Sequence, residues 1–202
     1  MTDFDEGYET PSDAFTLTIV RGIDADTVVA RLLGPNPQSF ASFDDAIDWT
    51  MDSDTYDRVP LTVGQIGTDT FVWEENGFYL SLQQCAASVS AGGQLTSVFV
   101  NVNGVMRFVH AVDGTVVRTF DPGFRTGELA IDAVGDVLPE ELRVQWPTPD
   151  LEEYDVDPVN AALQVQALIY GTPLPTREWL EDPSVRTFGT NHDRMTEMNW
   201  QY

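Results

Sequence analysis

Three dipeptides with the chemistry of tight β-hairpin turns lie within about forty residues of each other in this 202-residue chain. They are Asn76-Gly77, Asn103-Gly104 and Asp113-Gly114. Asn, Asp and Gly tolerate the positive φ angles that a two-residue hairpin of type I′ requires. Because β-forming residues flank each turn, the sequence predicts an antiparallel β-meander in the middle of the chain.

The strands that we expect in this sheet are recognised by short apolar or alternating runs. They cover residues 14–20, 61–66, 70–75, 78–82, 95–102, 105–112 and 115–120. We therefore predict an antiparallel sheet of about six or seven strands, in which Asn76-Gly77 joins 70–75 to 78–82.

Helices are predicted between and after these strands from caps and apolar periodicity. We expect them at residues 25–33, 44–51, 81–91, 128–138 and 158–170, with a last short one after Thr176. The clearest has Asp157 as its cap, Pro158 at its first position and Gly171 at its end. With these helices packed on one face of the sheet, the chain belongs to the α+β class.

The chain is long enough for one large domain with a real core. We expect a disordered acidic leader at 1–13, a single α+β domain at 14–182 and a loosely ordered tail at 183–202.

Acidic side chains outnumber basic ones by 33 to 10, every basic one is arginine, and the net charge is −23. Three blocks without a basic residue lie near 3–13, 44–57 and 150–157. The second consists of Asp44, Asp45, Asp48, Asp52, Asp54 and Asp57. Such a surface repels nucleic acid and anionic membranes and attracts basic partners.

The absence of lysine has a second explanation that concerns the source of the chain. A GC-rich genome replaces lysine by arginine, and a salt-adapted proteome adds acidic residues throughout. Both explanations stay open beside a surface shaped for one partner.

The sequence contains no motif typical of a metal site or a cofactor site. The single cysteine excludes an internal disulfide and a cysteine-based zinc site, and the two histidines do not form a known metal motif. No phosphate-binding loop is present either. We expect no cofactor and no metal. Because the start of the chain is acidic and no apolar run could span a bilayer, we expect a cytoplasmic protein.

A thiol enzyme is one alternative reading. Cys85 lies near the start of a predicted helix, His110 lies on a later strand and Asp121 ends the next one. This order is similar to the layout of papain-like and transglutaminase-like enzymes, in which a helix N-terminus and a histidine activate the thiol.

A small-ligand-binding module on the sheet face is another alternative.

The arginines are scattered along the chain, except that Arg107 and Arg118 lie on neighbouring predicted strands. Pairing through the Asp113-Gly114 turn predicts these two diagonally opposed on one face, where they would make a small cationic spot.

The chain as a whole resembles an uncharacterised actinobacterial family, domain-of-unknown-function family 6461. The resemblance rests on residues 15–22, 30–34, 74–78, 97–103, 107–109, 113–114 and 120–122, followed by the late helix. It implies one domain from a GC-rich bacterial or phage source and no particular activity.

The leading hypothesis is therefore a non-enzymatic acidic domain that binds a basic protein or a nucleic-acid-binding protein. Its role would be that of an inhibitor, an immunity-like factor or a nucleic-acid mimic, with the block from Asp44 to Asp57 as the interaction surface.

Overall fold

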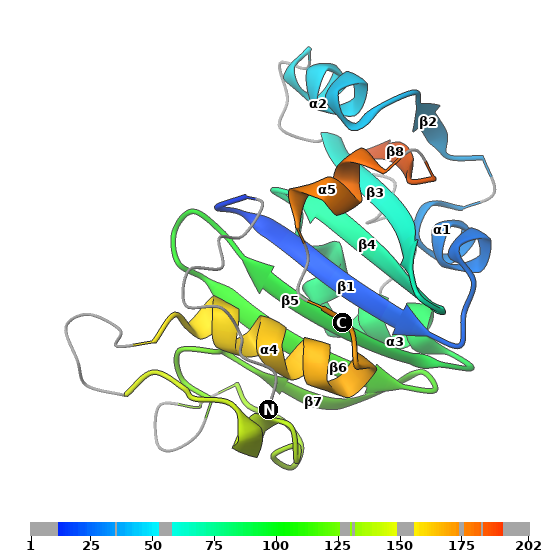
Figure 1. The fold of residues 1–202 in the computed structure, drawn as a ribbon. Coiled ribbons are helices and arrows are strands. Elements are labelled where there is room, and N and C mark those ends of the chain that lie inside the picture. Colours follow the sequence, from blue (N-terminus) through cyan, green and yellow to red (C-terminus); the bar gives the residue numbers. More distant parts are fainter. Residues whose placement is uncertain are drawn as a thin grey trace.

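The computed structural model describes residues 12–34, 36–52, 58–125, 130, 132–148, 156–173, 176–182 and 184–191. Their strands form one antiparallel sheet in the order β2-β8-β3-β4-β1-β5-β6-β7 (Figure 1). The strands are β1 (Phe15–Arg21), β2 (Gln38–Phe40), β3 (Arg58–Ile66), β4 (Asp69–Glu75), β5 (Gln94–Val100), β6 (Met106–Val112), β7 (Thr115–Phe120) and β8 (Arg186–Asn191). The α+β class is confirmed, with eight strands rather than six or seven.

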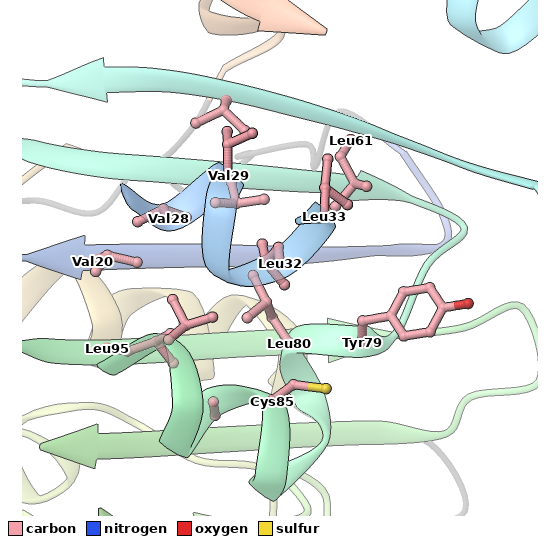
Figure 2. Packing of buried hydrophobic residues seen from close by; sticks show 14 of the residues in the cluster. Val20, Val28, Val29, Leu32, Leu33, Leu61, Tyr79, Leu80, Cys85 and Leu95 are labelled. Carbon is pink, nitrogen blue, oxygen red and sulfur yellow. The ribbon is translucent and has the colours of Figure 1, made fainter. Parts of the chain in front are cut away.

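Helices cover both faces of this sheet, whereas the sequence analysis places them on one. They are α1 (Ala25–Leu33), α2 (Phe43–Met51), α3 (Gln83–Ser90), α4 (Pro158–Tyr170) and α5 (Arg177–Glu181), with short 3-10 turns η1 (Tyr79–Ser81) and η2 (Glu141–Arg143). One face, here the α3 face, packs α1, η1 and α3 on β-strand residues such as Val20 and Leu95 (Figure 2). The other, the α4 face, packs α4 and α5 on Leu17, Trp73 and their neighbours. Central strands are buried on both sides, so the apolar pattern alone does not limit the helices to one face.

The predicted meander is confirmed as β5-β6-β7, and the two turns explain why these strands are neighbours. Asp113 and Gly114 have φ angles of 46° and 79°, as a type I′ turn requires. Asn103-Gly104 lies in a longer loop in which only Gly104 has positive φ, while the Asn101 side chain accepts the N–H groups of Asn103 and Val105.

The predicted hairpin at Asn76-Gly77 is wrong, although Asn76 does have a positive φ of 50°. After β4 the chain enters η1 and then α3 instead of a strand. The buried Glu74 carboxyl group accepts the N–H groups of Tyr79 and Leu80 at 2.8 and 2.9 Å, which holds this turn in place. The Asn76-Gly77 turn thus leads into helical segments and not into a second strand.

A β-bulge changes the predicted register of β6 and β7. Val112 pairs with Thr115 and Ala111 with Val116, but His110 pairs with Arg118, so Val117 is an extra residue. A shift of one residue reverses which face every later side chain points to. Arg107 and Arg118 therefore lie on opposite faces, and the predicted cationic spot does not form.

Two other segments differ from the expectation. Part of the predicted tail forms β8, which lies between β2 and β3 inside the sheet. The described part of the predicted 128–138 helix is not helical, and its Val134 forms an isolated bridge to Thr119 of β7. β8 pairs with strands that are distant in the sequence, which local patterns do not reveal.

Candidate functional site

Four predicted interaction residues form a stripe along α2. Asp44, Asp48 and Asp52 follow one another at intervals of one helical turn, with Asp45 beside the first, and all four are exposed. Ala46 lies on the opposite side of the helix and is fully buried. The helix thus brings these four predicted residues together. Asp54 and Asp57 lie outside the described residues.

The two ends of this acidic stripe have opposite effects on the helix that carries it. Ser42 caps the N-terminus by accepting the Asp45 N–H at 3.1 Å, and acidic residues in the first turn favour the helix dipole. Asp48 and Asp52 lie at the opposite end, where the dipole disfavours negative charge, and no basic residue occupies the last turn. Like charges four residues apart add further repulsion.

Aromatic packing fixes α2 on the β2 end of the sheet. The ring of Trp49 lies 5.3 Å from that of Phe40 and directly over Gly189 of β8. Arg58 of β3 donates to the Trp49 carbonyl at 2.6 Å and stacks on the indole ring at 4.7 Å. The stripe is therefore held on a defined support.

A groove of about 590 Å³ lies beside this helix, between α2, α5, β8 and the end of β4. We call it the acidic groove. Its carboxylates are Asp44, Glu75, Glu181 and Asp182, and its apolar side chains include Phe43, Ile47, Leu180 and Val185. No basic side chain is found among the described residues that line it. A groove with this lining fits a cation on an apolar stem.

Two of the groove carboxylates are held by hydrogen bonds. Glu75 accepts the Trp73 indole N–H at 2.9 Å and the Ser12 hydroxyl at 2.6 Å. Asp182 accepts the hydroxyl and the N–H of Ser184 at 2.6 and 2.8 Å. These two bonds, the hydroxyl first, lower the pKa of Asp182, so it stays ionised.

Most described arginine side chains are used inside the molecule and do not offset this charge. Arg118 and Arg125 pair with Glu141, Arg21 with Asp69 and Arg186 with Asp26. Arg31 donates to the carbonyls of Val89 and Ala91, and Arg58 donates to Trp49. None of these arginines offsets the charge of the α2 stripe.

The structure does not bring Cys85, His110 and Asp121 together. Cys85 is fully buried in the core of the α3 face, beside Leu80 (Figure 2). On β6, Val109 and Ala111 belong to that same core, so the alternation of side chains directs His110 to the α4 face. The cysteine and the histidine lie on opposite sides of the sheet.

Electrostatics also disfavour a thiol nucleophile. Burial, followed by the nearby Glu74, raises the pKa of Cys85 to about 12, so the thiolate is not available at neutral pH. Burial lowers the pKa of His110, whose Nε2 lies 3.1 Å from the Gln94 amide nitrogen. Asp121 lies at the end of β7, in a separate cavity.

Several residues of the groove were missed in the sequence analysis. Glu75 and Asp182 are 107 positions apart, and only the pairing of β8 with β3 places α5 next to α2. An acidic residue followed two positions later by serine, as in Asp182 and Ser184, is a local turn signal. That signal predicts a turn and does not predict a groove.

The described residues contain no group of three His, Cys, Asp or Glu side chains arranged to hold a metal ion. Within the same ranges, none of the helices has the length and apolar character needed to cross a bilayer.

Comparison with known proteins gives a family assignment. Residues 4–162 match a family of unknown function, DUF6461. The chain belongs to this family. Searches of curated proteins and of solved structures found no match.

Only part of the candidate site lies within the residues that match the family. It includes α2 and the Glu75 end of β4, and it ends within α4. The wall of the acidic groove formed by α5 and β8 comes from residues after this range. The stripe on α2 is thus the part of the site that lies in the segment matched to DUF6461.

Proposed function

We propose that this member of DUF6461 is a non-enzymatic interaction domain that binds a basic protein through the α2 stripe and the acidic groove. The partner class that fits best is a nucleic-acid-binding protein, whose cationic surface recognises regularly spaced negative charge. The domain would then act as an inhibitor, an immunity-like factor or a nucleic-acid mimic.

The observation that carries this proposal is the position of Asp48 and Asp52 at the C-terminal end of α2. Charge there destabilises the helix, and no described arginine neutralises it. Helix stability therefore does not explain why these carboxylates are present. Binding to a cationic partner would explain it.

The shape of the adjacent surface supports the same partner. The apolar side chains that line the acidic groove suit the methylene stem of an arginine or lysine, and the carboxylates suit its charged end. A flat acidic surface would attract cations without orienting them, whereas a groove limits how a partner can approach.

The setting that we propose is the cytoplasm of a bacterium or of a phage-infected cell, with an actinobacterial source for the family. Support comes from the use of arginine without lysine and from a composition that contains one cysteine only.

The test asks whether binding of a cationic peptide depends on where the negative charges lie or only on how many there are. A fluorescent nona-arginine peptide is titrated into the full chain, and into two variants that each lose two negative charges. One variant is Asp48→Asn with Asp52→Asn, in the stripe. The other is Asp13→Asn with Asp136→Asn, at exposed positions elsewhere.

We expect the stripe variant to bind at least about fivefold more weakly than the matched control, with affinity falling steeply as salt rises from about 0.05 to 0.5 M. Equal weakening by both variants would show that total charge alone governs binding. That result would refute the stripe as a site.

A further inference from the structure

A second cavity, of about 440 Å³, lies at the opposite end of the sheet, where β6 begins and β7 ends. We call it the meander cavity. Arg107, Asp121 and Asp132 provide its charges, Gln83 and Thr119 add neutral polar groups, and the remaining side chains are apolar. This cavity therefore contains both signs of charge, unlike the acidic groove.

Arg107 is an exception among the arginines. It is half-buried, yet its side chain forms no hydrogen bond or salt bridge with any residue that the structure describes. The side chain of Arg143, which also has no such partner among the described residues, is exposed to solvent. A guanidinium that is partly removed from water and has free donors is suited to a carboxylate ligand.

Asp121 faces the same cavity from the adjacent strand. It is half-buried, and its Oδ1 accepts the Gly123 N–H at 2.8 Å, which fixes the carboxylate. Burial and the neighbouring Asp132 raise the pKa of Asp121, while Arg107 lowers it without forming a direct ion pair. The two carboxylates thus provide a place for a cation a short distance from Arg107.

Apolar side chains also line the meander cavity. Val105 and Val134 are 52% and 49% exposed, which leaves apolar surface uncovered beside the charged groups. Met106 and Phe120, whose side chains are buried in the core of the α4 face, also belong to the lining. The cavity volume lies within the range of small-molecule sites.

We propose that the meander cavity binds a free α-amino acid with an apolar side chain. The ligand carboxylate accepts hydrogen bonds from the Arg107 guanidinium, and the ligand ammonium group donates to Asp121 and Asp132. The apolar side chain covers Val105 and Val134. A zwitterion satisfies both charges at once, whereas an anion would be repelled by the carboxylates and a simple cation by the arginine.

The ligand is free rather than part of a peptide because both charged groups are required. A peptide end-residue carries only one of them. This site is independent of the proposed partner surface, since none of its residues lines the acidic groove or lies on α2.

The experiment is a titration of the full chain with L-leucine, L-methionine and L-phenylalanine, followed by calorimetry and by backbone amide NMR. N-acetyl-L-leucine and L-leucinamide, which lack the positive and the negative charge respectively, test the two ends of the ligand. We expect saturable binding of at least one free amino acid, shifts confined to the cavity, and at least about tenfold weaker binding of both blocked forms.

Variants assign the contacts. Arg107→Gln and Asp121→Asn should each weaken binding by about tenfold or more, and Arg107→Lys should weaken it less than Arg107→Gln, because charge is kept while the planar fork is lost. Arg143→Gln and Asp136→Asn, at exposed positions outside the cavity, serve as matched controls and should bind like the wild type. Melting temperatures establish that each variant is folded.

Three results would overturn the proposal. They are the absence of saturable binding for all three amino acids up to about 10 mM, equal binding of the blocked forms, and wild-type affinity in folded Arg107→Gln. Binding of nona-arginine to the α2 stripe should be the same in all cavity variants, so failure of one proposal does not imply failure of the other.

Discussion

The two edges of the sheet are closed in different ways. At the β7 edge, residues 132–146 pack against the strand, and Arg118 donates to the buried Glu141 at 2.8 and 3.0 Å. At the β2 edge, α2 covers the strands through an aromatic ring placed over a glycine. One edge uses arginines in the interior, whereas the other exposes the carboxylates of α2, which no described arginine pairs.

This difference shows where a strongly acidic chain uses its small number of arginines. Arg118 and Arg125 are both used by one buried glutamate, and each also stacks on an aromatic ring. The described acidic side chains of α2 are not paired with any described arginine. The β7 edge is organised for stability, and the β2 edge is organised in a way that suits an external cation.

The largest effect is expected from breaking the buried pair at the β7 edge. Glu141→Gln leaves Arg118 buried without its counter-charge, which should cost about 3–5 kcal/mol of unfolding free energy. Chemical denaturation would measure it. Asp26→Asn removes the exposed pair with Arg186 and is the matched control, with an expected loss below about 1 kcal/mol. Similar losses in both variants would contradict the contrast between buried and exposed pairs.

Between the two edges, Glu74 has a buried carboxyl group whose pKa burial raises from 4.5 to about 7, despite two N–H bonds that lower it. Because the folded state holds the proton more tightly, this group stabilises the protein most below pH 4.5 and loses that contribution as pH rises toward 7. Glu74→Gln should remove this dependence.

The measurement is the stability difference between wild type and Glu74→Gln from pH 4.5 to 8. The wild type should lose about 3 kcal/mol relative to the variant as pH rises through this range. A constant difference at all pH values would refute the raised pKa.

The next effect concerns the support of α2 at the β2 edge. A Cβ on Gly189 would lie 2.5 Å from the Trp49 ring, so Gly189→Ala should cost about 1–3 kcal/mol and change Trp49 emission. Adding Trp49→Leu should relieve part of the clash, because the Phe40 ring, 2.8 Å from the same Cβ position, remains. The two substitutions should therefore be non-additive. Additive losses would indicate that the ring is not what limits this position.

The sequence predicts the β5-β6-β7 edge better than the β2-β8-β3 edge for a physical reason. Asp113-Gly114 joins neighbours through a two-residue turn, so residue type alone reveals the pairing. Gly189 pairs with Gln38 and Pro60, which are more than 120 positions away, and no local pattern specifies such partners.

Within the candidate site too, features that depend on local spacing were predicted, and features that depend on contacts between distant residues were missed. The stripe on α2 depends only on helical spacing, and Asp44, Asp45, Asp48 and Asp52 were therefore identified. The register of Arg118 depends on a bulge at Val117, and the environment of Cys85 depends on which face covers it. Neither can be read from the order of residues along the chain.

The smallest expected effect tests the claim that the acidic stripe serves binding rather than folding. Asp48→Asn with Asp52→Asn removes negative charge from the C-terminal end of α2 and one repulsive pair four residues apart. Unfolding free energy should therefore rise by about 0.3–1 kcal/mol, while binding of a cationic peptide weakens. Asp45→Asn should have the opposite sign, a small loss, because a carboxylate in the first turn favours the helix dipole. A loss of stability in the Asp48 and Asp52 variant would mean that these side chains hold α2 together, and the argument that they are retained for a partner would fail.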